Sequence, residues 1–96
     1  MSNGKVEVFL VLRVNLTVSK SFFDSIRQQV AEIIPALLPY AENTLQTLCG
    51  DDYWYAMPVE RRRIAGQVMA YMVQHDLLPF EFSGHLCTSP KRYRLK

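Results

Sequence analysis

Hydrophobic and polar positions alternate over residues 5–18, KVEVFLVLRVNLTV. One face of such a strand carries only apolar residues: Val6, Val8, Leu10, Leu12, Val14, Leu16 and Val18. Since side chains of a β-strand point alternately to its two faces, this pattern predicts one long N-terminal strand. At ~3.3 Å per residue the strand would span about 46 Å, too long for a compact domain of this size. It therefore bends, breaks into a strand and an extended arm, or pairs outside the monomer; we favour an edge covered by a second subunit.

The period changes to that of a helix at about residue 20, with apolar residues at Phe22, Ile26, Val30, Ile33, Ile34 and Leu37. Ser19 and Ser21 offer N-cap oxygens, and Asp24 follows Ser21 at the spacing of a capping box. Pro35 should kink or restart this helix and Pro39 should end it, because proline lacks the amide hydrogen and crowds the preceding turn.

A second, short helix is predicted from about Tyr40 to Leu48, with Gly50 as its left-handed stop. Residues 51–57, DDYWYAM, are then expected to form a connector. Its three consecutive aromatics, Tyr53, Trp54 and Tyr55, cannot all point inward. They form either a packed corner beneath the next helix, which we favour, or an exposed patch for stacking or partner binding.

The central helix is predicted over residues 58–74, PVERRRIAGQVMAYMVQ. Pro58 suits the first helical position, and Glu60 suits the positive end of the helix dipole. At 100° per residue, one side collects Ile64, Ala65, Val68, Met69, Tyr71, Met72 and Val73. The opposite side collects Glu60, Arg63, Gly66, Gln67, Ala70 and Gln74. The helix therefore has one face for the core and one polar face.

A β-hairpin is predicted from about residue 78 to residue 96, after Pro79 ends the helical pattern. Phe80 and Phe82 alternate with Glu81, and Ser83-Gly84 signals a turn into a loop over about residues 83–90. On the returning strand, Tyr93 and Leu95 should point inward, and Arg92, Arg94 and Lys96 should point outward. The fold class is therefore α+β: a long N-terminal strand, two to three helices over residues ~20–76, and a C-terminal hairpin.

Composition is that of one globular domain spanning residues 1–96, with 49% hydrophobic and 21% charged residues. The longest apolar run is far shorter than the ~20 residues of a membrane span, and the N-terminus does not resemble a secretory signal. Two cysteines, Cys49 and Cys87, are too few and too far apart for a disulfide framework, which favours a reduced cytoplasmic protein.

Charge is distributed unevenly around a net value of +2. Residues 1–57 hold four basic and six acidic residues, net −2, whereas residues 58–96 hold seven basic and three acidic residues, net +4. A basic C-terminal half is favourable for binding nucleic acid, although basic patches without that role are common.

Enzymatic chemistry is not expected, because the chain lacks a nucleophile elbow, a glycine-rich phosphate loop and a Glu-x-x-His pair. Cys49, His75, His85 and Cys87 could ligate a metal, but no close pair has the usual zinc spacing. We therefore expect no metal and no cofactor. Cys49 is interpreted as a small core residue, and His75 as a residue that suits the negative end of the helix dipole.

Nucleic-acid contact is predicted for the polar face of the central helix and for the hairpin. Arg63 could pair with guanine and Gln67 with adenine. The residues placed to contact phosphates are Arg62, Lys91, Arg92 and Arg94. Arg61 falls within the apolar stripe and should snorkel outward or pair with an acid such as Asp51 or Asp52. The alternative interpretation is that the ERRR segment is a solvated helix start.

Residues ~36–96 resemble a winged helix-turn-helix domain: helix, short helix, corner, longer helix and two-stranded wing. The segment ERRRIAGQVMAYMVQHDLLPFEF is also similar to small proteins of phages and other mobile elements. The resemblance implies a DNA-binding transcriptional regulator or an anti-defence protein, and we expect a homodimer formed through the N-terminal strand. The alternative function is a protein-interaction module that inhibits a host protein, with the long strand or Tyr53–Tyr55 as its contact surface.

Overall fold

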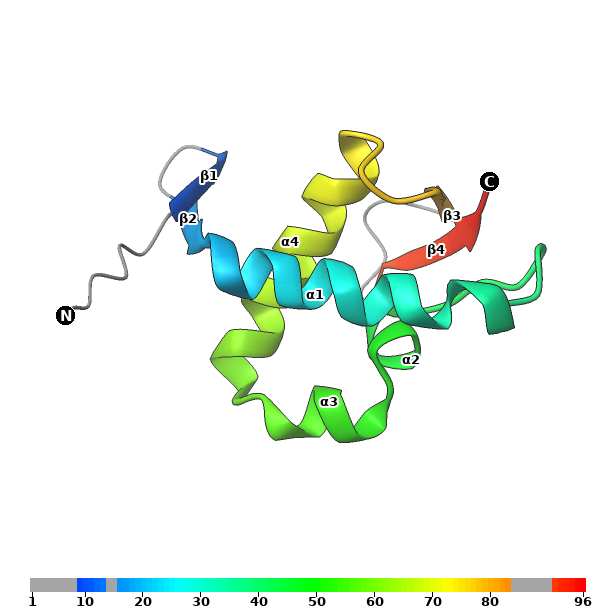
Figure 1. Cartoon of the computed structure of the whole chain (residues 1–96), viewed down its shortest axis with the longest axis horizontal. Helices are drawn as coiled ribbons and strands as arrows, with labels where there is room; N and C mark the ends of the chain where they lie inside the picture. The colour runs from blue at the N-terminus through cyan, green and yellow to red at the C-terminus, as the bar shows by residue number, and fades with distance from the viewer. Residues whose placement is uncertain (1–8, 14–15, 84–90) are drawn as a thin grey trace, which may run out of the picture.

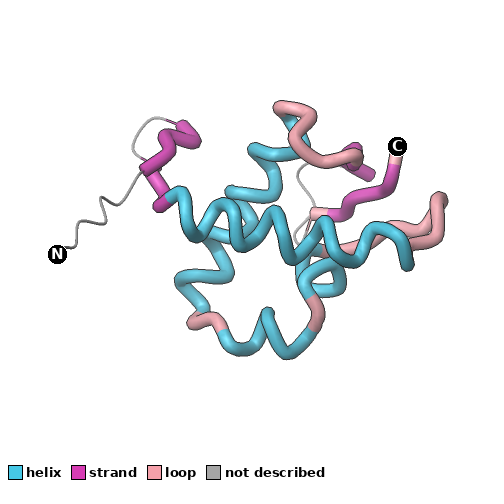
Figure 2. The backbone as a smooth tube through the Cα atoms, in the orientation of Figure 1, coloured by secondary structure: helices cyan, strands magenta, loops and turns pink. Residues whose placement is uncertain are grey.

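The computed structural model describes residues 9–13, 16–83 and 91–96. These residues form mixed α+β structure, with four α-helices where two to three were predicted. The elements are β1 (Phe9–Arg13), β2 (Leu16–Ser19), α1 (Lys20–Ile33), the 3₁₀ helix η1 (Ile34–Ala36), α2 (Leu45–Cys49), α3 (Asp51–Ala56), α4 (Val59–Gln74), β3 (Phe80–Ser83) and β4 (Arg92–Leu95). The two antiparallel hairpins lie toward opposite ends of α1, and the helices occupy the space between them (Figures 1 and 2).

The prediction of a single strand over residues 5–18 is wrong. The chain reverses between Arg13 and Leu16, so that β1 pairs antiparallel with β2 and Leu10 lies opposite Val18. Residues 5–8 lie outside the described part. The reversal keeps the apolar alternation, since Val18 is buried and Leu10 is half-buried. It also supplies backbone hydrogen-bond partners within the chain, which a 46 Å strand would have needed from elsewhere.

Helix α1 begins where the sequence predicts. The Ser19 Oγ accepts a hydrogen bond from the backbone N–H of Phe22 at 3.2 Å, which confirms Ser19 as the N-cap. The helix buries Phe23, Ile26 and Val30 and ends at Ile33, just before Pro35. The chain continues as η1 with Pro35 inside it, as a helix restarted by proline would.

Two predictions between α1 and α4 are wrong. The helix expected from Tyr40 begins only at Leu45, because Asn43 is held extended by two 2.8 Å backbone hydrogen bonds to Tyr93 of β4. The expected connector over residues 51–57 is helical as α3. Gly50 separates α2 from α3 with a φ of +86°, a conformation that glycine adopts at little cost.

Helix α4 has the predicted core face and a defined end. Pro58 is its N-cap rather than its first residue. The helix buries Ala65, Val68, Met69, Met72 and Val73 against α1 and the C-terminal hairpin. At its end Asp76 takes a φ of +56°, and the N–H of Leu77 donates to the carbonyl of Met72 at 2.8 Å. Together with the hydrogen bond from the N–H of Asp76 to the carbonyl of Val73 at 3.3 Å, this bond forms a Schellman motif, which turns the chain toward β3.

The C-terminal hairpin forms as predicted and contributes to the core. β3 pairs with β4 so that Phe82 lies opposite Tyr93 and Glu81 lies opposite Arg94. Phe80 and Tyr93 are 0% and 2% exposed, which confirms the inward position of Tyr93. The predicted loop over residues 83–90 lies outside the described residues, apart from Ser83.

Candidate nucleic-acid interface

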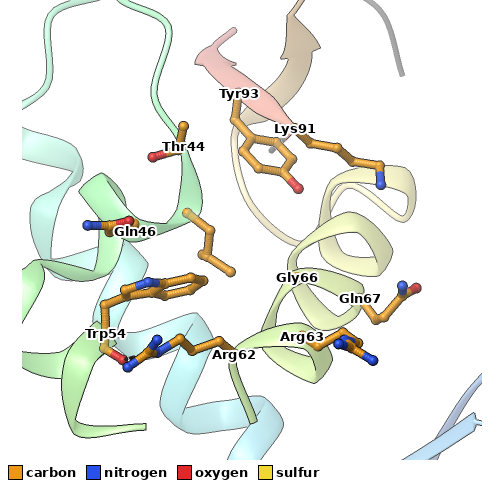
Figure 3. A pocket seen from close by; sticks show the side chains of 10 residues that line it. Thr44, Gln46, Trp54, Arg62, Arg63, Gly66, Gln67, Lys91 and Tyr93 are labelled. Carbon is orange, nitrogen blue, oxygen red and sulfur yellow. Dashed lines mark hydrogen bonds between the residues drawn. The ribbon is translucent and has the colours of Figure 1, made fainter. Parts of the chain in front are cut away.

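A cleft of about 260 Å³ lies between α4, the start of β4 and the segment from Thr44 to Trp54 (Figure 3). Four of the six residues predicted to contact DNA line it: Arg62, Arg63, Gln67 and Lys91. Trp54, predicted as part of a partner-binding patch, lines it too. Arg92 and Arg94 do not belong to its lining. The structure thus divides the predicted site into two separate groups.

Helical spacing explains why α4 contributes four residues to the cleft. Residues at positions i, i+1, i+4 and i+5 lie on neighbouring parts of one helix face, and here they are Arg62, Arg63, Gly66 and Gln67. Gly66 leaves the wall open, because a Cβ atom built at this position meets no atom within 4 Å. The face is less exposed than a free helix surface would be: Gly66 and Gln67 are half-buried.

The cleft is electropositive and contains no carboxylate. Its basic residues are Arg62, Arg63 and Lys91, and no Asp or Glu belongs to its lining. Among the described residues, the side chains of Arg63 and Lys91 have no ion-pair or hydrogen-bond partner. Both cations are therefore available to an anionic ligand without the breaking of an existing ion pair with a described residue.

Arg62 has a structural role as well as a charge. Its Nε donates to the backbone carbonyl of Trp54 at 3.1 Å, and its guanidinium carbon lies 5.0 Å from the centroid of the Tyr55 ring. These contacts fix α4 against α3. A guanidinium has five N–H donors, so Arg62 keeps donors for a phosphate.

The arginines of the hairpin are paired with acids. Arg94 donates from Nη2 and Nε to the Oε2 of Glu81 at 2.8 and 3.1 Å. The Nη1 of Arg92 lies 3.6 Å from the Oε1 of Glu42. A hydrogen bond donated by the Ser83 hydroxyl, with the charge of Arg92 as a smaller cause, lowers the pKa of Glu42 below its ordinary value. Glu42 is therefore ionised at neutral pH and compensates the charge of Arg92.

Arg61 differs from both groups. Its guanidinium carbon lies 4.9 Å from the centroid of the Phe22 ring, over the face of that ring. The side chain is exposed, as snorkelling predicts. The alternative of a pair with Asp51 or Asp52 is wrong, because the guanidinium lies on the α1 side of the helix instead.

The three consecutive aromatics do not act as one unit. Trp54 is half-buried and lines the cleft, and Tyr53 is half-buried against the core. Tyr55 is 62% exposed, and its hydroxyl accepts a hydrogen bond from the Nε2 of Gln46 at 3.1 Å. A packed corner therefore describes Tyr53 and Trp54, and the exposed alternative describes only Tyr55.

Two buried titratable side chains have raised pKa values. Burial raises the pKa of Cys49 to about 11, so the thiol is protonated at neutral pH and packs as the predicted core residue. Burial also raises the pKa of Tyr93 to about 12, and its ring lines the cleft.

His75 stacks on Tyr71 at 4.1 Å between ring centroids, at the end of α4.

The metal-ligand candidates divide between described and masked parts of the chain. His85 and Cys87 lie outside the described residues. Within the described ranges, no three His, Cys, Asp or Glu side chains gather as metal ligands would.

The remaining cleft residues were not predicted as site residues. Thr44, Leu45 and Gln46 come from the start of α2, and Tyr93 was predicted only as a core residue. No local pattern links these positions to α4, since they lie about 20 and about 30 residues away along the chain and the pairing of Asn43 with β4 brings them together.

No protein-family model, curated protein or solved structure matches the chain. None of the helices in the described part of the chain has both the length and the apolar character needed to cross a bilayer.

Proposed function

We propose that this protein binds double-stranded DNA through the basic residues that line the cleft and acts as a transcriptional regulator. One observation carries the proposal: Arg63 and Lys91, about 30 residues apart in sequence, line one cleft that holds no carboxylate, and neither has a partner among the described residues. Duplex DNA presents closely spaced phosphates that are surrounded by counterions. Unpaired basic side chains can neutralise these phosphates and release the counterions, which drives binding.

The order of elements supports a winged-helix arrangement. Helices α1 to α4 are followed by the hairpin of β3 and β4, and winged helix-turn-helix domains, which the sequence resembles, also place a two-stranded wing after their helices. In this arrangement α4 enters the major groove by its N-terminal half. Arg63 and Gln67, near that end and on its polar face, would contact the edges of bases. Arg62 and Lys91 would contact phosphates on either side.

Arg92 and Arg94 have a smaller part in this proposal than the sequence suggested. A phosphate that approaches either arginine competes with the carboxylate of Glu42 or Glu81. Exposed ion pairs contribute only about 0–1 kcal/mol, so they can open, but each opening leaves an acid beside the DNA. We therefore assign the main contacts to the cleft.

Fluorescence anisotropy with a labelled duplex of ~20 bp, about two helical turns, tests the proposal. With the two phosphate contacts of Arg62 and Lys91 formed, the logarithm of the binding constant should fall against the logarithm of the salt concentration with a slope of about −1.8. Polyglutamate of matched charge is the control, because it offers charge without a groove. A duplex that does not bind at low salt, or binds no better than polyglutamate, contradicts the proposal.

The exposed residues of the N-terminal hairpin support the homodimer expected for such a regulator. Phe9 and Val11 of β1 are 61% and 67% exposed, although each is a residue that usually packs. We propose that a second copy of the chain covers this hairpin, forming a homodimer. Light scattering tests this: a dimer that dissociates in the Val11→Lys variant supports it, and a wild-type monomer at high micromolar concentration contradicts it.

A further inference from the structure

The cleft contains a buried hydroxyl with no partner among the described residues. Tyr93 is only 2% exposed, and its ring packs against Phe82 at 5.5 Å between centroids. Its hydroxyl points into the cleft (Figure 3) and makes no hydrogen bond to the described part of the chain. Buried tyrosine hydroxyls usually find a partner, so this hydroxyl is available for a hydrogen bond to a polar atom of a ligand.

The lining of the cleft around this hydroxyl includes an aromatic ring and a residue without a side chain. The indole of Trp54 lies on the α3 side, and Gly66 presents backbone only on the α4 side (Figure 3). Leu45 completes the apolar part of the lining. An indole on one side and bare backbone on the other leave room for a planar ring, and the volume of about 260 Å³ restricts the ligand to a compact one.

The charges of the cleft define the rest of the ligand. Arg63 is exposed and Lys91 is half-buried, and both line the cleft together with the neutral amide of Gln67. Unpaired cations beside an apolar slot favour an acidic group attached to the ring.

We propose that the cleft binds a small planar aromatic ring that carries a carboxylate or phosphate group. The ring lies against Trp54, the acidic group meets Arg63 and Lys91, and the hydroxyl of Tyr93 bonds to a polar atom of the ring. Such a ligand occupies the cations that we assign to DNA contact, and it therefore competes with the duplex. This regulatory consequence rests on the proposed function, whereas binding of the ligand itself does not.

Trp54 is the single tryptophan of the chain, so its indole N–H gives one signal in a ¹H–¹⁵N correlation spectrum. The experiment titrates the protein without DNA. The probes are salicylate, an aromatic carboxylate, and adenosine monophosphate, an aromatic phosphate; salicylamide and adenosine are their uncharged counterparts. We expect the indole signal to shift and saturate with at least one acid, and its neutral counterpart to bind at least about tenfold more weakly. The probe that binds shows whether the cleft accepts a carboxylate or a phosphate.

Two variants test the geometry. Tyr93→Phe keeps the buried ring and removes only the hydroxyl, and we expect it to weaken the acid about three- to tenfold. Tyr71→Phe is the matched control, since Tyr71 packs on Phe23 and His75 outside the cleft lining, and it should change the affinity less than about twofold.

Three results would overturn the proposal: no saturable shift with either acid at millimolar concentration, equal affinity for an acid and its neutral counterpart, or equal effects of Tyr93→Phe and Tyr71→Phe. Because the titration contains no DNA, its failure leaves the proposed DNA binding standing. Conversely, a protein that binds the acid but no duplex retains the ligand site and loses the regulatory consequence.

Discussion

On the cleft face, Arg63 and Lys91 have no partner among the described residues, whereas on the hairpin Arg92 and Arg94 lie against Glu42 and Glu81. Both groups belong to the basic C-terminal half, whose net charge is +4 over residues 58–96. The net charge of this half does not distinguish the two groups, because it includes only the acidic residues of the same half and omits Glu42, which pairs with Arg92. Of the two groups, the cleft residues therefore keep their positive charge without a neighbouring carboxylate among the described residues.

The largest expected difference between the two groups is the loss of duplex binding when a single arginine of each is replaced. Arg63→Ala should cost about 1–3 kcal/mol of duplex binding and reduce the preference among DNA sequences, since an arginine near bases contributes specificity. Arg92→Ala should weaken all sequences alike and by much less. Competition binding against a pool of duplexes measures both effects. Equal losses on every sequence from Arg63→Ala would remove that residue from base contact.

Removing the acids of the hairpin should erase the difference between the two groups. In the double variant Glu42→Gln and Glu81→Gln, Arg92 and Arg94 become available to phosphates. The slope of the salt dependence should steepen from about −1.8 toward about −3.6, because up to two more phosphates are neutralised.

The control for that double variant is Asp24→Asn with Glu32→Gln on α1, which makes the same change in net charge. Its acids pair with no arginine: Asp24 bonds to Lys20, and Glu32 bonds to Gln28. An equal change of slope in both double variants would show that net charge alone matters, not its position.

The substitution Gly66→Ala should have a smaller effect, which stabilises the fold but weakens ligand binding. A methyl group at this position meets no atom within 4 Å, and alanine favours a helix interior, so Gly66→Ala should stabilise the fold by about 0.5–1 kcal/mol. It also places the methyl on the cleft wall and should weaken the salicylate or nucleotide probe. Urea unfolding measures the first effect and the indole titration the second.

The control is Gly50→Ala, which should destabilise the fold because φ is +86° there. If Gly66→Ala destabilised the protein as Gly50→Ala does, the open space at the cleft wall would be refuted.

The smallest expected effect concerns the pH dependence of the hairpin group. The lowered pKa of Glu42 means that its carboxylate contributes to stability above its unfolded-state pKa of about 4.3, and this contribution is lost as the pH falls through the lower folded-state pKa. Ser83→Ala removes the main cause and should raise the pKa toward its ordinary value. A pH titration of the Glu42 carboxyl carbon by NMR measures the shift; identical titrations in both proteins would contradict the hydrogen bond.

Local patterns predicted the elements that depend on local forces. The core face of α4 follows from apolar spacing, and the start of α1 follows from the Ser19 oxygen. The N-terminal strand failed because alternation is the same in one long strand and in two paired strands, and no Gly or Pro between Arg13 and Leu16 marks the reversal. Helix α3 was missed because three aromatics in a row are poor helix formers, although the acids of its first turn favour a helix start.

Some residues of the candidate site could likewise be placed from local patterns, and others could not. Helical periodicity is sufficient to place Arg63 and Gln67 on one face of α4. It cannot bring Lys91 to that face, nor Glu42 to Arg92 about 50 residues away, because both depend on the pairing of Asn43 with Tyr93. The sequence therefore identified the basic residues but not which of them are neutralised.

The most direct test is the salt dependence of duplex binding in two matched double variants, Arg63→Gln with Lys91→Gln and Arg92→Gln with Arg94→Gln. Each removes two positive charges from the same half of the chain. We predict that the cleft variant reduces the slope by about 0.9, because Lys91 contacts a phosphate, and also loses sequence preference, because Arg63 contacts bases, whereas the hairpin variant changes the slope by less than about 0.5 and keeps the preference. Equal changes, or a larger change in the hairpin variant, would contradict the assignment of DNA binding to the cleft.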